Sequence, residues 1–197
     1  MRNAEKLKNS MRIGGVYRRK DLEDFSTALD RDLKTLVARK EVLKVAGGLY
    51  YRPRKNSFGF KPPNDRDLVR TFLKTNDFLL TSFNYFNQLG LGLTQVYNNY
   101  VVYNHKGSGN FSLGGKRFKF RVVPAYPPRM SKEFLLVDLL NNLKDLPDNT
   151  ELVLRNLNAR LSEFDQKRVL KYVHRYGRHS ARAVVQKAYD YVRPRVT

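Results

Sequence analysis

Hydrophobic residues between positions 27 and 40 recur at the three- and four-residue spacing of a helix that buries one face. The apolar residues at this spacing are Leu29, Leu33, Leu36 and Val37. Ser26 precedes the segment, and its hydroxyl can accept a free backbone N–H of the first turn. The pattern therefore predicts a helix that starts at Thr27, with Ser26 as its N-cap.

Two short β runs follow this helix. Val42–Val45 and Leu49–Tyr51 flank the turn Ala46-Gly47-Gly48, which is typical of a hairpin. Upstream, residues 21–25 predict a short helix, and Val16-Tyr17 has the character of a brief strand. Residues 3–10 predict a lead helix. The order favours a winged helix-turn-helix, with residues 44–55 as the wing.

The rest of the chain predicts a second domain with a small sheet and helices. Residues 52–64 are basic and rich in Pro and Gly without periodicity, so we interpret them as wing exit and linker. Residues 95–123 are β in character and predict an antiparallel sheet, and Ser162 starts a capping-box pattern. The predicted helices begin at or near Asp65, Thr81, Ser131, Asp148, Asp165 and Ser180. The fold class is therefore α+β, with a first domain over residues 1–62 and a second over residues 63–197.

Charge adds a functional expectation. The chain has 38 Lys and Arg against 18 Asp and Glu, a formal net charge of +20 that favours a polyanionic partner. Residues 1–62 have 16 basic against 7 acidic residues, and residues 165–197 have 9 against 2. The middle is nearly balanced, so the excess lies at the two ends of the chain. This distribution favours nucleic acid but does not choose between DNA and RNA.

Patterns typical of enzymes are missing from the sequence. There is no cysteine, and the three histidines lack the spacing and acidic neighbours of a zinc or general-base site. Asp65 and Asp67 fit the first turn of a helix better than a metal site, because the helix dipole favours acids there. We expect no enzyme activity, no metal and no cofactor. With no apolar run of roughly 18–20 residues and no signal-peptide core, we expect a cytoplasmic protein without a membrane partner.

The winged helix-turn-helix prediction supplies candidate DNA-binding residues. Thr27, Arg31 and Lys34 fall on the outer side of the predicted helix, where they can approach base edges or phosphates. The full candidate set is Arg18, Arg19, Lys20, Ser26, Thr27, Arg31, Lys34, Lys44, Arg52, Arg54 and Lys55. Two interpretations remain open for the first three: they contact phosphates, or they form a solvated turn.

Two other segments allow alternatives. In the strand 117–123, Phe118, Phe120 and Val122 alternate with Lys119, Arg121 and Val123, so a basic face opposes an apolar one. An RNA-binding accessory protein can use such a face together with basic C-terminal helices. The helices predicted over 165–176 and 181–192 allow a second helix-turn-helix, or a basic hairpin that covers the domain or receives an acidic protein partner.

The order of parts resembles the AbiEi antitoxins of bacterial type IV toxin–antitoxin systems. The resemblance spans most of the chain, and the residues that show it are Asp21-Leu22, Leu29–Leu36, Gly48–Tyr51, Thr81-Ser82-Phe83, Leu89-Gly90-Leu91 and Arg117–Val123. It implies a DNA-binding repressor of its own promoter that counteracts a cognate nucleotidyltransferase toxin. The second domain is short for this family and ends in an unusually basic hairpin. The operator sequence and the oligomeric state stay open.

Overall fold

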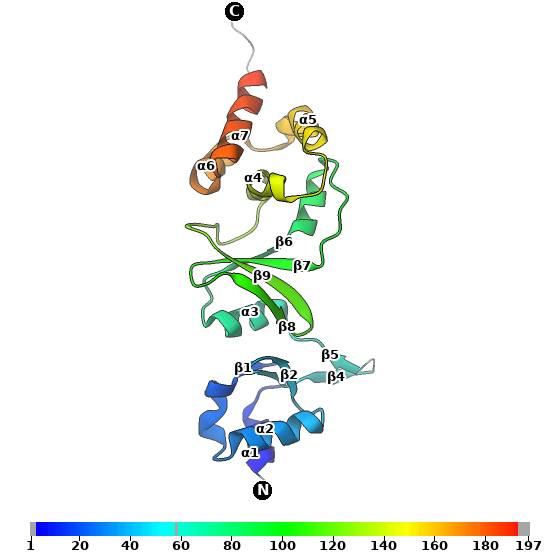
Figure 1. Ribbon diagram of the computed structural model, residues 1–197, viewed down its shortest axis with the longest axis vertical. Helices are drawn as coiled ribbons and strands as arrows, with labels where there is room; N and C mark the ends of the chain where they lie inside the picture. Colours follow the sequence, from blue (N-terminus) through cyan, green and yellow to red (C-terminus); the bar gives the residue numbers. More distant parts are fainter. Residues whose placement is uncertain (1–2, 58, 193–197) are drawn as a thin grey trace, which may run out of the picture. The chain divides into compact units, whose positions relative to one another are not determined.

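The computed structural model describes residues 3–57 and 59–192 of an α+β protein with small antiparallel sheets and C-terminal helices (Figure 1). The predicted fold class is confirmed at this level. The chain divides into two compact units: unit 1 comprises Met1–Phe78 and Lys106–Phe120, and unit 2 comprises Leu79–His105 and Arg121–Thr197. This division does not coincide with the expected boundary at Pro62. Phe58 of the predicted linker and Arg193 and Arg195 of the basic C-terminus lie outside the described residues.

Unit 1 begins with helices packed on a three-stranded sheet. The sheet has the order β1-β3-β2 and is antiparallel, and Figure 1 shows α1 and α2 on the same side of it. The elements are α1 (Asn3–Ser10), β1 (Val16–Arg18), the 3-10 helix η1 (Arg19–Phe25), α2 (Leu29–Ala38), β2 (Leu43–Ala46) and β3 (Leu49–Tyr51). The predicted lead helix, brief strand and two β runs are confirmed as elements.

The core of this part is formed by the stripe that the sequence predicts. Leu29, Leu33 and Leu36 are buried against residues of α1 and η1, including Leu7 and Leu22. Each of these side chains favours the interior because burial removes apolar surface from water. The outer side of α2 remains exposed to solvent.

The predicted start of α2 was wrong by two residues. The helix begins at Leu29, its N-cap position is Ala28, and Thr27 lies in a turn. Ser26 Oγ accepts a hydrogen bond from the Ala28 amide at 3.1 Å and donates one to Asp32 Oδ2 at 2.6 Å. Ser26 therefore closes a local turn instead of capping the helix, because its hydroxyl is held by the buried Asp32 carboxylate.

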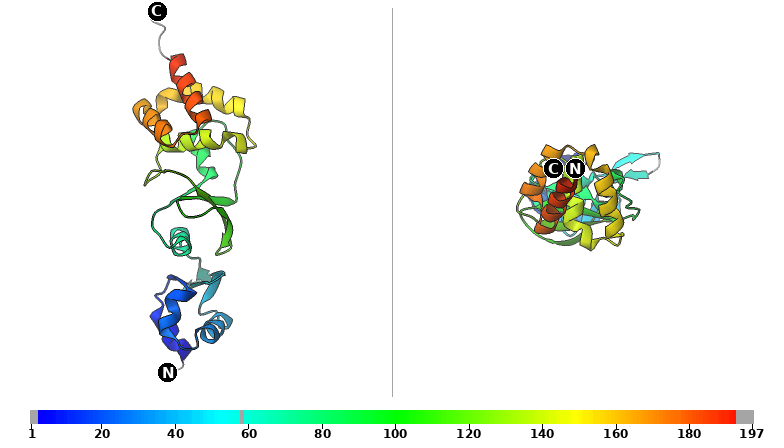
Figure 2. Two further views of the ribbon diagram at one scale, coloured as in Figure 1. Left: turned by 60° about the vertical axis from the view of Figure 1, so that its left-hand side comes forward. Right: turned by 90° about the horizontal axis from the view of Figure 1, so that it is seen from above.

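Residues 54–56 and 59–61 form a pair of antiparallel strands where the sequence predicted a linker. Strands β4 (Arg54–Asn56) and β5 (Gly59–Lys61) pair with Arg54 opposite Lys61 and Lys55 opposite Phe60. The hairpin projects from the rest of unit 1 (Figures 1 and 2). Its described side chains are exposed, so it has no buried face and shows no period of two in the sequence. Tyr51 Oη donates to the Lys61 carbonyl at 2.8 Å and fixes the base of the hairpin.

Helix α3 (Asp65–Leu73) and the strands β8 (Gly109–Leu113) and β9 (Lys116–Val122) complete unit 1, with the division falling inside β9. Asn64 is the N-cap of α3, because its side chain accepts from the amides of Arg66 and Asp67, and the helix begins at Asp65 as predicted. The rings of Phe72, Phe111 and Phe120 pack together with centroid distances of 4.7–5.4 Å. The Gly114 amide in the β8–β9 turn donates to the Val45 carbonyl of β2 at 2.8 Å.

Unit 2 is mainly helical. Its strands β6 (Leu79–Ser82) and β7 (Asn99–Asn104) are antiparallel, in a sheet of order β6-β7-β9-β8. Figure 1 shows α4 to α7 together on one side of β6 and β7. The helices are η2 (Phe83–Leu89), α4 (Lys132–Asn142), η3 (Leu143–Asp145), α5 (Thr150–Arg160), η4 (Leu161–Glu163), α6 (Gln166–Tyr176) and α7 (His179–Val192). The core of unit 2 is centred on α4, which is buried on most sides.

The N-caps of η2, α4 and α6 can be compared with the helix starts that the sequence predicts. Ser82 and Ser131 are confirmed as N-caps, the latter accepting from the Phe134 amide at 3.2 Å. Helix α6 is capped by Asp165, which accepts from the Arg168 amide, and not by a capping box from Ser162. Ser162 instead falls in the short turn η4, because the chain bends there before α6 begins.

Two strand predictions in this region were wrong. Residues 96–97 are not a strand, because the Tyr97 amide donates to the Asn84 side chain at 2.7 Å and not to a neighbouring strand. The alternation in β9 ends after Phe120: Val122, which was expected on the apolar face, is 52% exposed.

Candidate nucleic-acid interface

The outer face of α2 presents the residues that were expected to approach DNA. Arg31 has a side chain that is 75% exposed, and Lys34, one turn further along the same face, is exposed as well. Thr27 is exposed in the turn that precedes the helix. Because Leu29, Leu33 and Leu36 fix the opposite face in the core, these three polar side chains are held outward by packing.

Arg18 and Arg19 form ion pairs within unit 1. Arg18 Nε donates to Asp21 Oδ2 at 2.8 Å, and these hydrogen bonds hold the pKa of the Asp21 carboxyl below its usual range. Arg19 donates from two guanidinium nitrogens to both oxygens of Asp30, at 2.7 and 2.8 Å, and from the third to Glu23 at 2.6 Å. The Arg19 guanidinium therefore joins η1 to the first turn of α2. Arg18 therefore joins the end of β1 to η1, Arg19 positions α2, and Lys20 beside them remains exposed.

Arg52 also has a structural role. Its Nη1 donates to the carbonyl oxygens of Lys8 and Met11, both at 2.6 Å. The last carbonyls of a helix have no partner inside the helix, and a cation there also complements the helix dipole. Arg52 therefore holds the end of α1 against the end of β3. Of the eleven candidates, Arg18, Arg19, Ser26 and Arg52 have side chains engaged inside unit 1.

The β4–β5 hairpin adds cations on a separate projection. Arg54 stands directly opposite Lys61, and like charges in such a pair repel. Lys55 Nζ lies 5.4 Å from the centre of the Phe60 ring, which is 38% exposed. An anion placed between Arg54 and Lys61 relieves their repulsion. Sequence reasoning missed Lys61, and the signal that indicates it is its place in a basic, turn-punctuated segment.

The β2–β3 hairpin contributes Lys44, which is exposed opposite Tyr50. The turn at its tip uses Gly48 with a φ of 67°, a backbone conformation that side chains with a Cβ rarely adopt. The Gly48 carbonyl accepts from the Arg19 amide at 2.8 Å, so this turn is tied to the start of η1.

Seven exposed basic side chains lie on η1, α2, β2, β4 and β5, and we call this set the open cations. They are Lys20, Arg31, Lys34, Lys44, Arg54, Lys55 and Lys61. Within residues 3–57 and 59–192, the nearest carboxylate to any of them is Asp32, 3.9 Å from Arg31. Unpaired cations on one part of a fold are suited to bind phosphates.

The alternative basic face on β9 is not present as predicted. Lys119 is exposed, but the Arg121 side chain is only 15% exposed. Its guanidinium donates to Asn142 Oδ1 and lies 5.6 Å from the centre of the Phe83 ring. Arg121 is therefore used inside unit 2, because the amide and ring partners compensate for its burial.

The described part of the chain shows neither a metal-binding cluster nor a membrane-spanning helix. It contains no group of three or more His, Asp or Glu residues arranged to hold a metal ion. None of its helices combines the length and the apolar composition that crossing a bilayer requires.

Comparison with known proteins gives a structural neighbour but no family. No family model matches the chain, and no curated protein matches its sequence. Among solved structures, the crystal structure of the RV2827C protein from Mycobacterium tuberculosis is similar, with a TM-score of 0.61 and 12% sequence identity. The match covers 95% of this chain and 76% of that protein. At this identity the similarity concerns the fold alone, so the α+β arrangement has a counterpart in an experimental structure.

Proposed function

We propose that residues 3–51 form a winged helix-turn-helix that binds duplex DNA, with α2 as the recognition helix and the β2–β3 hairpin as the wing. The observation that supports this most directly is the contrast between two sets of cations. Arg18, Arg19 and Arg52 are engaged in holding the elements together, whereas the open cations have no acid partner closer than 3.9 Å. A rigid frame that presents unpaired cations is what recognition of a polyanion requires.

The geometry of α2 suits the major groove. Its ten residues extend for about 15 Å, and the major groove of B-DNA is about 12 Å wide and admits one α-helix. Arg31 can offer two donors to the O6 and N7 atoms of a guanine. Lys34 and Thr27 then lie within reach of a neighbouring base edge or phosphate.

The two hairpins act on the DNA backbone. Lys44 on the wing contacts phosphates beside the groove that α2 enters. Arg54, Lys55 and Lys61 on the β4–β5 hairpin contact the backbone further along the duplex. These contacts set affinity and register, whereas α2 reads sequence.

The biological role that we propose is repression of the protein's own promoter in the cytoplasm, with antitoxin activity against a cognate nucleotidyltransferase. The support for this role is the resemblance to the AbiEi antitoxins, joined to the DNA-binding arrangement of unit 1. Two experiments separate its parts. Repression is measured with a reporter gene behind the protein's own promoter, and neutralisation by co-expression with the nucleotidyltransferase encoded beside it.

DNA binding is tested by fluorescence anisotropy with a labelled promoter duplex over a range of salt concentrations. If about six phosphates are neutralised, log K falls against log salt with a slope of roughly −5. The Arg31→Ala, Lys34→Ala double variant should weaken binding by at least about tenfold, the loss of one good base contact. Arg155→Ala, which removes an exposed cation from α5, is the matched control and should leave binding unchanged.

Two outcomes contradict the proposal. One is promoter binding that does not depend on salt or on Arg31 and Lys34. The other is displacement of the promoter duplex by structured RNA at equal concentration, which would favour the accessory RNA-binding role instead.

A further inference from the structure

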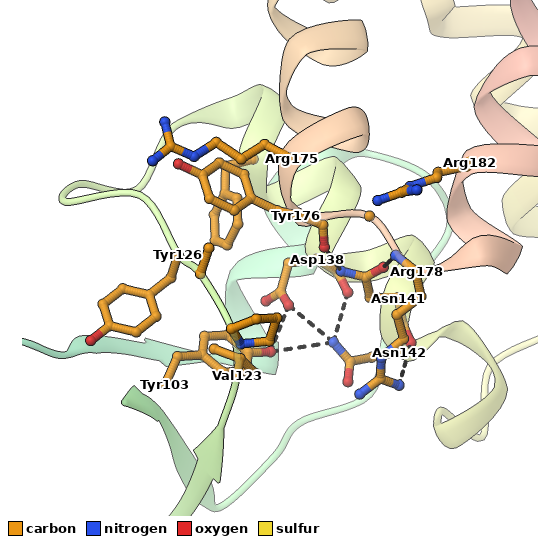
Figure 3. Close-up of a pocket in the computed structure, with 14 residues that line it drawn as sticks. Tyr103, Val123, Tyr126, Asp138, Asn141, Asn142, Arg175, Tyr176, Arg178 and Arg182 are labelled. Atoms are coloured by element: carbon orange, nitrogen blue, oxygen red, sulfur yellow. Dashed lines mark hydrogen bonds between the residues drawn. The ribbon is translucent and has the colours of Figure 1, made fainter. Parts of the chain in front are cut away.

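Unit 2 contains a cavity of about 180 Å³ beside α4. Its walls come from β7, the connector after β9, and the junction of α6 with α7 (Figure 3). Drug-sized ligands occupy pockets of about 300–1,000 Å³, so this cavity suits a smaller molecule. The polar side chains that decide its chemistry are Tyr103, Asp138, Asn142, Arg178 and Arg182.

Asp138 leaves one carboxylate oxygen without a partner. The residue is 2% exposed, and its Oδ1 accepts hydrogen bonds from Tyr103 Oη at 2.6 Å and Asn142 Nδ2 at 3.0 Å. Its Oδ2 is buried and has no hydrogen-bond partner. Burial raises the pKa of Asp138 to about 6. Buried polar atoms almost always have a partner, so this oxygen marks a position where a donor from another molecule fits.

Three arginines also line the cavity, namely Arg175, Arg178 and Arg182. Arg178 Nη1 donates to the Asn141 carbonyl at 3.1 Å, and Arg182 Nη2 donates to the His174 carbonyl at 2.9 Å. Arg175 lies 5.5 Å from the centre of the Tyr176 ring. These partners are neutral, and no carboxylate in the described chain forms an ion pair with any of the three. Since a guanidinium has five N–H donors, most of their donors remain for an anion.

The remaining wall is aromatic. Tyr176 packs edge-on against Phe134 with a centroid distance of 5.4 Å, and both line the cavity. In Figure 3 the Arg182 side chain points from α7 toward the cavity, and Asp138 lies at the centre of the drawn residues. The cavity thus combines one free carboxylate oxygen, a cationic side and an apolar side.

We propose that this cavity binds a small zwitterion of the α-amino-acid class. The ammonium group donates to Asp138 Oδ2, the carboxylate accepts from Arg178 and Arg182, and an apolar side chain lies against Tyr176. The single free oxygen favours one ammonium over the paired donors of a nucleobase, because Oδ1 already accepts two hydrogen bonds. The cavity volume also suits an amino acid better than a nucleotide. This site is independent of the DNA-binding proposal.

Isothermal titration calorimetry on the full chain tests the site with the twenty amino acids at millimolar concentration. At least one amino acid with an apolar side chain should bind at a stoichiometry of one. Its N-acetyl form lacks the ammonium and its amide form lacks the carboxylate, so each should bind at least about tenfold more weakly, the loss of one charged hydrogen bond. Failure of all twenty, or equal binding of the N-acetyl form, would overturn the proposal. Guanosine monophosphate serves as the nucleotide probe, and its binding in the absence of binding by any amino acid would also overturn the proposal.

Two variants assign the contacts. Asp138→Asn should reduce the affinity for the amino acid at least about tenfold while the N-acetyl form, which lacks the ammonium, loses nothing further. Asp190→Asn, at an exposed position of α7, is its control. Arg182→Gln changes an exposed residue and keeps the fold, so it tests the site even if the Asp138 variant misfolds. This variant should bind the amino acid more weakly than the parent protein does, but its affinity for the amide form should not change. Arg155→Gln is the control. Unchanged affinity in Arg182→Gln together with Arg178→Gln would contradict the assignment.

Discussion

Arg19 holds both carboxylate oxygens of Asp30, at 2.7 and 2.8 Å, although eleven positions separate the two residues. The contact fixes the first turn of α2 against η1, and so fixes the direction in which Arg31 and Lys34 point. The same hydrogen bonds raise the pKa of Arg19 further above its ordinary value and lower the pKa of Asp30. An arginine in a basic segment can therefore hold two elements of the fold together instead of contacting a ligand.

Replacement of Arg19 should separate these roles. We expect Arg19→Gln to weaken promoter binding less than Arg31→Ala, because it loosens α2 without removing a contact to DNA. The slope of log K against log salt should stay the same, since no phosphate contact is lost. Salt-titrated fluorescence anisotropy measures both quantities. A slope that becomes less steep by about one would show that Arg19 neutralises a phosphate.

Arg52 should affect stability more than binding. Arg52→Met removes two hydrogen bonds to the end of α1 and should lower the free energy of unfolding by at least about 1.5–3 kcal/mol, the contribution of one hydrogen bond from a charged group. Urea denaturation followed by circular dichroism measures the change. Arg54→Met, an exposed arginine two positions away, is the control and should change stability little. Equal stabilities of the two variants would contradict the role assigned to Arg52.

The β4–β5 hairpin should contribute phosphate contacts that add together. Each of Arg54→Gln, Lys55→Gln and Lys61→Gln should reduce the salt slope by about one, and the triple variant by about three. Affinity should fall to a similar degree for promoter and unrelated duplexes, because phosphate contacts do not read sequence. Anisotropy with two duplexes measures this. A loss confined to the promoter would mean that the hairpin contacts base edges.

Asp138 should make stability depend on pH in a known direction. Its pKa is raised from the ordinary 3.8 to about 6 by burial, so between these values the folded chain binds more protons than the unfolded chain. The free energy of unfolding should therefore rise as the pH falls from about 6 toward 4. Tyr103, Arg121, Asn142 and Arg178 lower the pKa of Asp138 and so offset part of the effect of burial. Burial also raises the pKa of Tyr103, and the neighbouring Asp138 adds to that rise.

The Asp138→Asn variant tests this dependence. Above pH 6 in the absence of ligand it should be more stable than the parent by up to about 3 kcal/mol, the equivalent of a shift of about two pKa units. The difference should shrink as the pH falls below 6 and disappear below about pH 3, where Asp138 is protonated in both states. Urea titrations at a series of pH values provide the measurement, with Asp190→Asn as the control. A constant difference at all pH values would contradict the buried-charge explanation.

Local and periodic signals in the sequence predicted most elements of the fold. The stripe of Leu29, Leu33 and Leu36 identified α2, and Asp65 and Ser131 marked where two other helices begin. These features depend on residues a few positions apart, and such spacing is visible in a single sequence. The same helical spacing predicted that Arg31 and Lys34 lie on the exposed face of α2.

Contacts between distant residues could not be predicted in this way. Arg52 meets the carbonyl of Lys8, 44 positions away, and nothing in the basic run around Arg52 distinguishes it from Arg54. The β4–β5 hairpin was missed because both its faces are exposed, so no apolar alternation marks it. The cavity in unit 2 was missed although a signal existed: Asp138 is an acid in the middle of a helix that is otherwise apolar on most sides.

The Gly114 amide of the β8–β9 turn donates to the Val45 carbonyl, so the environment of this amide depends on the position of β2. Gly114 has little room to shift, because a Cβ placed on it would lie 3.1 Å from Leu68 and 3.3 Å from Pro63. If the proposed wing binds a duplex, a displacement of β2 should therefore change the length of this bond. The resonance and the exchange rate of a single backbone amide would then report on the proposed DNA-binding face from a position outside it.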